Sequence, residues 1–143
     1  MSKVIDFVEH YHLELNYTCA ETILWAANDA WGMKLPEISR LMMGGFGGGM
    51  SYGVVCGGIS GGIAALSCLY NEKNGHESPF MRRVCHKFIK EVNEKMGELD
   101  CSELRPKYGS KLKEKRCIQT IKMIAEVLDK VYDEAVREKS IIE

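Results

Sequence analysis

Hydrophobic residues recur along this chain with the spacing of α-helices. Near the carboxyl end, apolar positions alternate steps of four and three residues: Cys117, Ile121, Ile124, Leu128, Val131 and Ala135. Such positions share one narrow face of a helix. The same spacing recurs near the start of the chain, at Val4, Val8, Tyr11 and Leu15. No run alternates apolar and polar residues as a half-exposed β-strand does. The pattern predicts one all-α domain over residues 1–143, built as a helical bundle.

Capping signals divide this bundle into helices. Thr18 stands three residues before Glu21, and Asp100 stands three residues before Glu103. Each pair has the form of a capping box and predicts a helix start. Pro36 predicts the start of a short helix. Further signals are the Ser78-Pro79 start and the glycine ends at Gly32 and Gly97.

The middle of the chain carries no charge and many glycines. No charged residue occurs from Leu41 to Asn71, and ten of the fourteen glycines lie from Gly44 to Gly62. The uncharged helical part is only as long as the shortest membrane spans and is rich in glycine, so we expect no membrane span. We expect instead a glycine-rich loop leading into a buried central helix. Its glycines, Gly57 and Gly58 among them, would let a neighbouring backbone or a cofactor approach closely.

Composition narrows the class of protein. The chain has 143 residues and a formal net charge of −1, which argues against a nucleic-acid partner. Its first residues lack the basic and apolar regions of a signal peptide, so we expect a cytoplasmic protein. Six cysteines in a reducing compartment are not expected to form structural disulfides. Metal binding, catalysis and buried free thiols remain open.

The cysteines fall at positions that favour reactivity. Cys19, Cys56 and Cys101 each stand at a predicted helix start, where unpaired N–H groups favour the thiolate. Cys117 lies on the apolar face of the last helix, so its sulfur should point inward. Cys68 and Cys85 lie inside predicted helices, where we expect small buried hydrophobic residues.

Spacing excludes several familiar sites. No Cys-x-x-Cys pair occurs, which excludes a zinc ribbon and a thioredoxin-like motif, and no Cys-x-x-Cys-His occurs, which excludes covalent haem. Glu9-x-x-His12 occurs once, whereas di-iron bundles need two such motifs. The stretch from Arg105 to Arg116 holds six basic residues and one acid. Positive charge there would favour thiolates at Cys101 and Cys117.

The glycine run with Cys56-Gly57-Gly58-Ile59-Ser60-Gly61, the segment Asn16 to Ala20, and the two later cysteines together resemble a known family. Its members are small bacterial and archaeal proteins named for the pattern C–GCAxxG–C–C and described as redox-active. A similar domain occurs in split-Soret cytochromes, which carry an iron–sulfur cluster and haem. The resemblance implies Cys19, Cys56, Cys101 and Cys117 as cluster ligands, with Gly57 and Gly58 at the cofactor. This chain lacks the haem-binding part of those cytochromes, so the resemblance implies an iron–sulfur cluster and no haem.

Three hypotheses about function follow. The first is electron transfer through an iron–sulfur cluster to an unknown redox partner. The second is a thiol–disulfide oxidoreductase that uses cysteine pairs. The third is a non-catalytic helical homodimer, paired through the apolar face of the last helix, with structural cysteines or a zinc site. Whether the protein is an enzyme stays open at this point.

Overall fold

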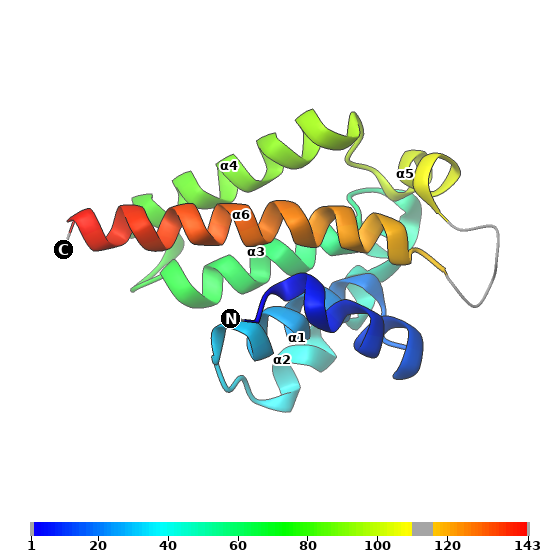
Figure 1. Cartoon of the computed structure of the whole chain (residues 1–143), viewed down its shortest axis with the longest axis horizontal. Helices are drawn as coiled ribbons and strands as arrows, with labels where there is room; N and C mark the ends of the chain where they lie inside the picture. Colours follow the sequence, from blue (N-terminus) through cyan, green and yellow to red (C-terminus); the bar gives the residue numbers. More distant parts are fainter. Residues whose placement is uncertain (1, 110–115, 143) are drawn as a thin grey trace.

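The computed structural model describes residues 2–109 and 116–142 (Figure 1). Its described part is built from helices and contains no β-strand, which confirms the predicted all-α single domain. The short 3-10 or π-helical turns are η1 (Val4–Phe7), η2 (His10–Glu14), η3 (Gly44–Phe46), η4 (Gly49–Gly53) and η5 (Gly75–Glu77). The α-helices are α1 (Cys19–Trp31), α2 (Glu37–Met42), α3 (Gly57–Tyr70), α4 (Pro79–Met96), α5 (Cys101–Tyr108) and α6 (Ile118–Ile142).

Helix α3 is the centre of the bundle, as the sequence predicts. It contacts α1, α4 and α6, and α6 runs along the long axis of the molecule (Figure 1). The predicted apolar face of α6 is buried from Ile121 to Ala135. This face therefore packs inside the chain and is not available for the homodimer of the third hypothesis.

Glycines in α3 allow the neighbouring helices to come close. A Cβ atom on Gly61 would lie 2.6 Å from the carbonyl oxygen of Ala20 in α1. One on Gly62 would lie 2.5 Å from the ring of Phe88 in α4. Because both contacts are shorter than atoms tolerate, the packing requires glycine at these two positions.

Most predicted boundaries are confirmed. Thr18 caps α1, since its Oγ1 accepts from the Glu21 N–H at 3.2 Å and Glu21 Oε1 accepts from the Thr18 N–H at 3.0 Å. Gly32 and Gly97 end their helices in the left-handed conformation. Helix α5 begins where predicted, but the expected capping box is wrong, because the Asp100 side chain makes no cap hydrogen bond.

Backbone pairing fixes the start of α5 instead. Asp100 forms an isolated antiparallel bridge with Val55. The Cys101 N–H donates to the Val54 carbonyl at 2.7 Å, and the Cys56 N–H donates to the Leu99 carbonyl at 2.9 Å. This bridge holds the starts of α3 and α5 side by side.

The first residues form short helical turns that end where Asn16 adopts a positive φ of 63°. Asp129 of α6 anchors them, because its carboxylate accepts from the N–H groups of Val4 at 2.7 Å and Ile5 at 3.2 Å. Leu15 is exposed, so the predicted apolar stripe ends one turn early.

The glycine-rich loop precedes α3 as predicted, and it contains η3 and η4. Met50 and Ser51 of η4 both have a φ of 58°. Among the described residues, none of the helices has the length and apolar character needed to cross a bilayer.

Candidate functional site: a cavity lined by four cysteines

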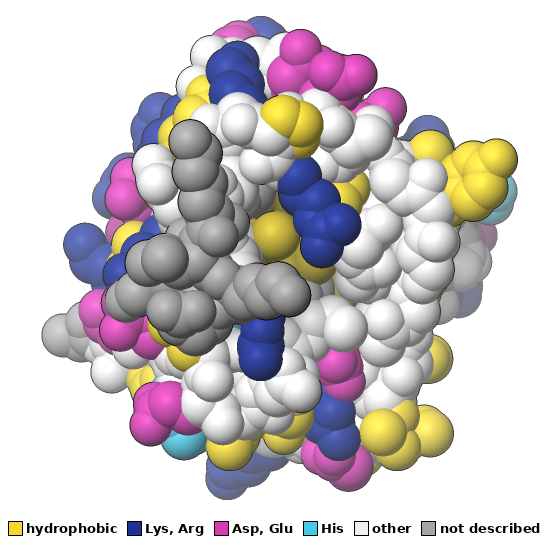
Figure 2. All heavy atoms as spheres, turned by 90° about the vertical axis from the view of Figure 1, so that its right-hand side faces the viewer, with side chains coloured by type: hydrophobic (Ala, Val, Ile, Leu, Met, Phe, Trp, Pro, Cys, Tyr) yellow, Lys and Arg dark blue, Asp and Glu magenta, His cyan; other side chains and the backbone are white. Residues whose placement is uncertain are grey.

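One cavity of about 550 Å³ collects the four predicted cysteines, Cys19, Cys56, Cys101 and Cys117. Figure 2 faces the end of the molecule that carries α5, and it shows a hollow with hydrophobic-class side chains inside and Lys or Arg side chains at its edge. All four cysteines are free thiols. Folding thus brings together four residues that are far apart in the sequence.

Each of these cysteines stands where a helix begins. Cys19 and Cys101 are the first residues of α1 and α5, Cys56 is the N-cap of α3, and Cys117 directly precedes α6. Helix starts offer unpaired N–H groups and a partial positive charge. The cavity is therefore suited to hold negative charge on sulfur.

Cys19 and Cys56 form a hydrogen-bonded pair of thiols. The Cys56 thiol donates to the Cys19 sulfur, which lowers the pKa of Cys19 to about 6. Backbone N–H groups of Gly48, Ala20 and Cys19 itself contribute to this lowering of the pKa, and burial opposes it. The pKa of Cys56 is raised by the same hydrogen bond and by burial. The first proton of the pair thus leaves Cys19, which carries the thiolate at neutral pH.

Gly57 and Gly58 shape the wall beside this pair. A Cβ atom on Gly57 would lie 2.4 Å from the Cys19 sulfur. One on Gly58 would lie 3.8 Å from the Cys56 sulfur and 3.0 Å from Cδ1 of Ile124. Gly57 therefore makes room for a thiol, while Gly58 chiefly makes room for α6. Their role at a cofactor stays a prediction.

Positive charge borders the cavity. Arg105 hydrogen-bonds the Cys117 sulfur, and this contact raises the pKa of Arg105. Burial raises the pKa of Cys101, and Arg105 partly offsets that effect. Arg116 also lines the cavity, whereas no Asp or Glu does so in the described part of the chain. The two ends of the predicted basic stretch, Arg105 and Arg116, thus both line the cavity, while its residues 110–115 lie outside the described residues.

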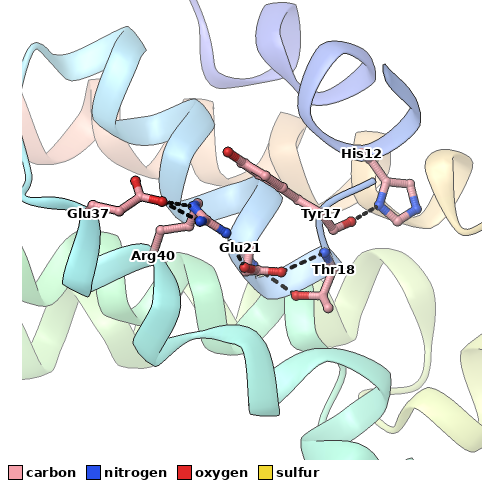
Figure 3. A network of polar contacts seen from close by, with 6 residues as sticks. All are labelled: His12, Tyr17, Thr18, Glu21, Glu37 and Arg40. Atoms are coloured by element: carbon pink, nitrogen blue, oxygen red, sulfur yellow. Dashed lines mark hydrogen bonds and ion pairs between the residues drawn. The ribbon is translucent and has the colours of Figure 1, made fainter. Parts of the chain in front are cut away.

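A polar network supports the start of α1 (Figure 3). The Arg40 guanidinium lies over the Tyr17 ring at 4.4 Å and donates to Glu21 at 2.6 Å. Glu21 in turn completes the cap with Thr18. The network holds in place the turn that carries Cys19.

Sequence reasoning missed this network and the buried His12. The imidazole lines the cavity, and its Nδ1 lies 2.9 Å from the Tyr17 carbonyl oxygen. Glu9-x-x-His12 drew attention to His12 only as half of a di-iron motif. Its burial depends on the turn at Asn16, which has no strong sequence signal.

The two remaining cysteines do not line the cavity. Cys85 is half-buried beside Met81, as expected of a packing residue. Cys68 is exposed, so its expected burial is wrong. It lies on the side of α3 that faces solvent, because α3 is apolar over more of its surface than the neighbouring helices cover.

The thiols surround the cavity instead of meeting at a point. Within residues 2–109 and 116–142, no three His, Cys, Asp or Glu side chains are grouped closely enough to hold one metal ion. The arrangement thus consists of one thiol pair, Cys19 with Cys56, and two further thiols, Cys101 and Cys117, on the same cavity.

The helical fold brings four cysteines, widely spaced along the chain, to one cavity. The chain belongs to the family described as "Putative redox-active protein (C_GCAxxG_C_C)", whose sequence profile matches residues 17–131. The matched range contains all four cavity cysteines. Neither the curated proteins nor the solved structures include a match to the chain.

Proposed function

We propose that this protein transfers single electrons through an iron–sulfur cluster bound by Cys19, Cys56, Cys101 and Cys117. The supporting observation is that all four thiols, and neither of the other two cysteines, line one cavity. Four thiolates are the usual ligand set of two-iron and four-iron clusters.

The cavity fits such a group in chemistry and in charge. Four thiols spread around about 550 Å³ favour a polynuclear cluster, whose thiolate ligands are shared among several irons. A single zinc ion would need the four sulfurs closer together, so zinc is the weaker alternative. The Arg105 and Arg116 side chains oppose the negative charge of a thiolate-bound cluster.

When bound, the cluster would supply a one-electron couple. The chain would tune that couple through the N–H groups at the starts of α1, α3 and α5, which stabilise the more negative, reduced state. Arg105 and Arg116 are exposed at the same end of the molecule. They suit a redox partner with an acidic surface, because opposite charges speed association.

Metal and sulfide analysis of anaerobically purified protein tests this proposal. Wild type should contain iron and acid-labile sulfide in equal amounts and absorb visible light, and Cys56→Ser should lose most of both. Cys68→Ser is the matched control, since Cys68 is exposed and outside the cavity. Wild type that contains zinc, or no metal, would contradict the cluster.

The second candidate, a thiol–disulfide oxidoreductase, is favoured by the Cys19–Cys56 pair. The Cys19 thiolate would attack a substrate disulfide and release one thiol. Cys56 would then lose its proton and displace the second thiol, which leaves Cys19 and Cys56 oxidised. Colourless, metal-free protein that reduces a model disulfide, and loses this activity in Cys19→Ser, would favour this function over the cluster.

We infer a cytoplasmic location, because six free cysteines suit a reducing compartment. A homodimer would need a surface other than the buried face of α6.

A further inference from the structure

Two polar atoms of the residues that line the cavity are buried and lack a partner among the described residues. They are His12 Nε2 and Thr120 Oγ1. Both side chains line the cavity and are only 5% and 3% exposed. Burying a polar atom without a hydrogen bond is costly, so these atoms indicate a polar ligand.

The neighbouring carbonyl decides what His12 offers such a ligand. Nδ1 of His12 lies 2.9 Å from the Tyr17 carbonyl oxygen, which can only accept, so Nδ1 carries the ring proton. Burial, and to a lesser extent the charge of Arg116, lowers the pKa of His12. The ring is therefore neutral near pH 7, and Nε2 presents a lone pair that needs an O–H or N–H donor.

Positive charge beside His12 and elsewhere on the cavity wall favours an anion. The Arg116 Nη1 donates to the His12 carbonyl at 2.6 Å, which places its guanidinium beside His12. Arg105 also lines the cavity, and it has more donors than its contact with Cys117 uses. No carboxylate among the described lining residues opposes them.

We propose that the cavity binds, at His12 and Thr120, a small free oxyanion that keeps an O–H group at neutral pH. The anion's O–H donates to His12 Nε2, and the Thr120 hydroxyl donates to another of its oxygens. Arg105 and Arg116 balance its charge. Hydrogen phosphate has this chemistry. Sulfate has a similar size and charge but no O–H, and it would place a lone pair against that of Nε2. This binding does not require the cluster, although both proposals draw on the charge of Arg105 and Arg116 at the same cavity.

Titration calorimetry with inorganic phosphate and with sulfate at pH 7 tests the proposal. Wild type should bind phosphate at least tenfold more tightly than sulfate, because only phosphate completes the His12 hydrogen bond. His12→Asn keeps an N–H for the Tyr17 carbonyl but removes the second ring nitrogen, and it should abolish the preference. His12→Gln places an amide oxygen near the position of Nε2 and should retain it.

Two arginine variants separate charge from hydrogen bonding. Arg116→Gln should lower the affinities for phosphate and for sulfate by a similar factor. Arg82→Gln, which removes an exposed charge on α4 away from the cavity, should change neither. Equal affinities in wild type, or a preference that persists in His12→Asn, would overturn the proposal.

Iron and sulfide are measured on the same preparations to keep the two proposals apart. Unchanged iron in His12→Asn with a lost phosphate preference supports the anion site. Absence of iron from every preparation refutes the electron-transfer proposal, while the calorimetry still decides the anion site.

Discussion

Replacing Gly57 with alanine should displace the Cys19 sulfur and raise its pKa. The new Cβ would lie 2.4 Å from that sulfur, whereas ordinary contacts begin at 3.4 Å, so the sulfur must move by about 1 Å. The Phe46 carbonyl oxygen at 3.0 Å and the Ala20 nitrogen at 3.1 Å limit retreat of the helix itself. A shift of this size breaks the hydrogen bond from Cys56 and moves the sulfur away from its N–H donors.

The variant should affect both acidity and stability. Gly57 is the first residue of α3, so the advantage that alanine has over glycine inside a helix does not apply in full there. Overpacking costs about 1–3 kcal/mol, which sets the expected loss of stability. The pKa of Cys19, about 6 in the wild type, should rise by at least about one unit toward its ordinary value of 9.0.

Alkylation rates measure this change directly. Metal-free, reduced protein is treated with iodoacetamide over a range of pH, and modification of Cys19 is followed by mass spectrometry. Gly45→Ala is the matched control, because a Cβ there meets nothing within 4 Å. If Gly57→Ala reacts with the same pH profile as wild type, then the space at Gly57 does not control the acidity of Cys19.

Three further changes test the packing and the thiol pair. Asp129→Ala should destabilise the fold by about 1–3 kcal/mol in urea unfolding, because it leaves two N–H groups of η1 without their acceptor. Gly62→Ala should lower the thermal midpoint, because its Cβ would lie 2.5 Å from the fully buried Phe88 ring. The stability advantage of wild type over Cys19→Ser should grow as pH rises from about 6 toward 9. In that window the unfolded thiol still holds the proton that the folded one has lost. The first expectation is contradicted if Asp129→Asn, which keeps a side-chain acceptor, loses as much stability as Asp129→Ala. The second is contradicted if Gly62→Ala has the thermal midpoint of the wild type. The third is contradicted if the stability difference between wild type and Cys19→Ser does not change with pH.

Local signals in the sequence were enough to predict where α1 and α4 begin and end and where α2 and α5 begin. Thr18, Gly32 and Gly97 act within one turn of chain, so their effect can be read from neighbouring residues. The spacing of apolar residues in α6 reports its buried face in the same way. Asp100 shows the limit, because the start that it marks is held by pairing with Val55, which is distant in the sequence.

The candidate site was only partly predictable. Its four cysteines could be selected from helix starts and family resemblance, but their arrangement around a cavity depends on how α1, α3, α5 and α6 pack. The burial of His12 and Thr120 depends on the same long-range packing. Cys68 lies in the apolar helix α3, yet its side chain is exposed. This exposure could not be predicted, because the sequence alone does not say which side of α3 its neighbours cover.

The bridge between Val55 and Asp100 has a consequence for how this protein can be altered. It links the residues next to Cys56 and Cys101 through main-chain atoms alone. Main-chain hydrogen bonds are largely indifferent to side-chain identity. The distance between these two sulfurs should therefore persist through extensive redesign of the surrounding surface. The fold could then serve as a rigid scaffold on which other thiol ligands or docking surfaces are engineered.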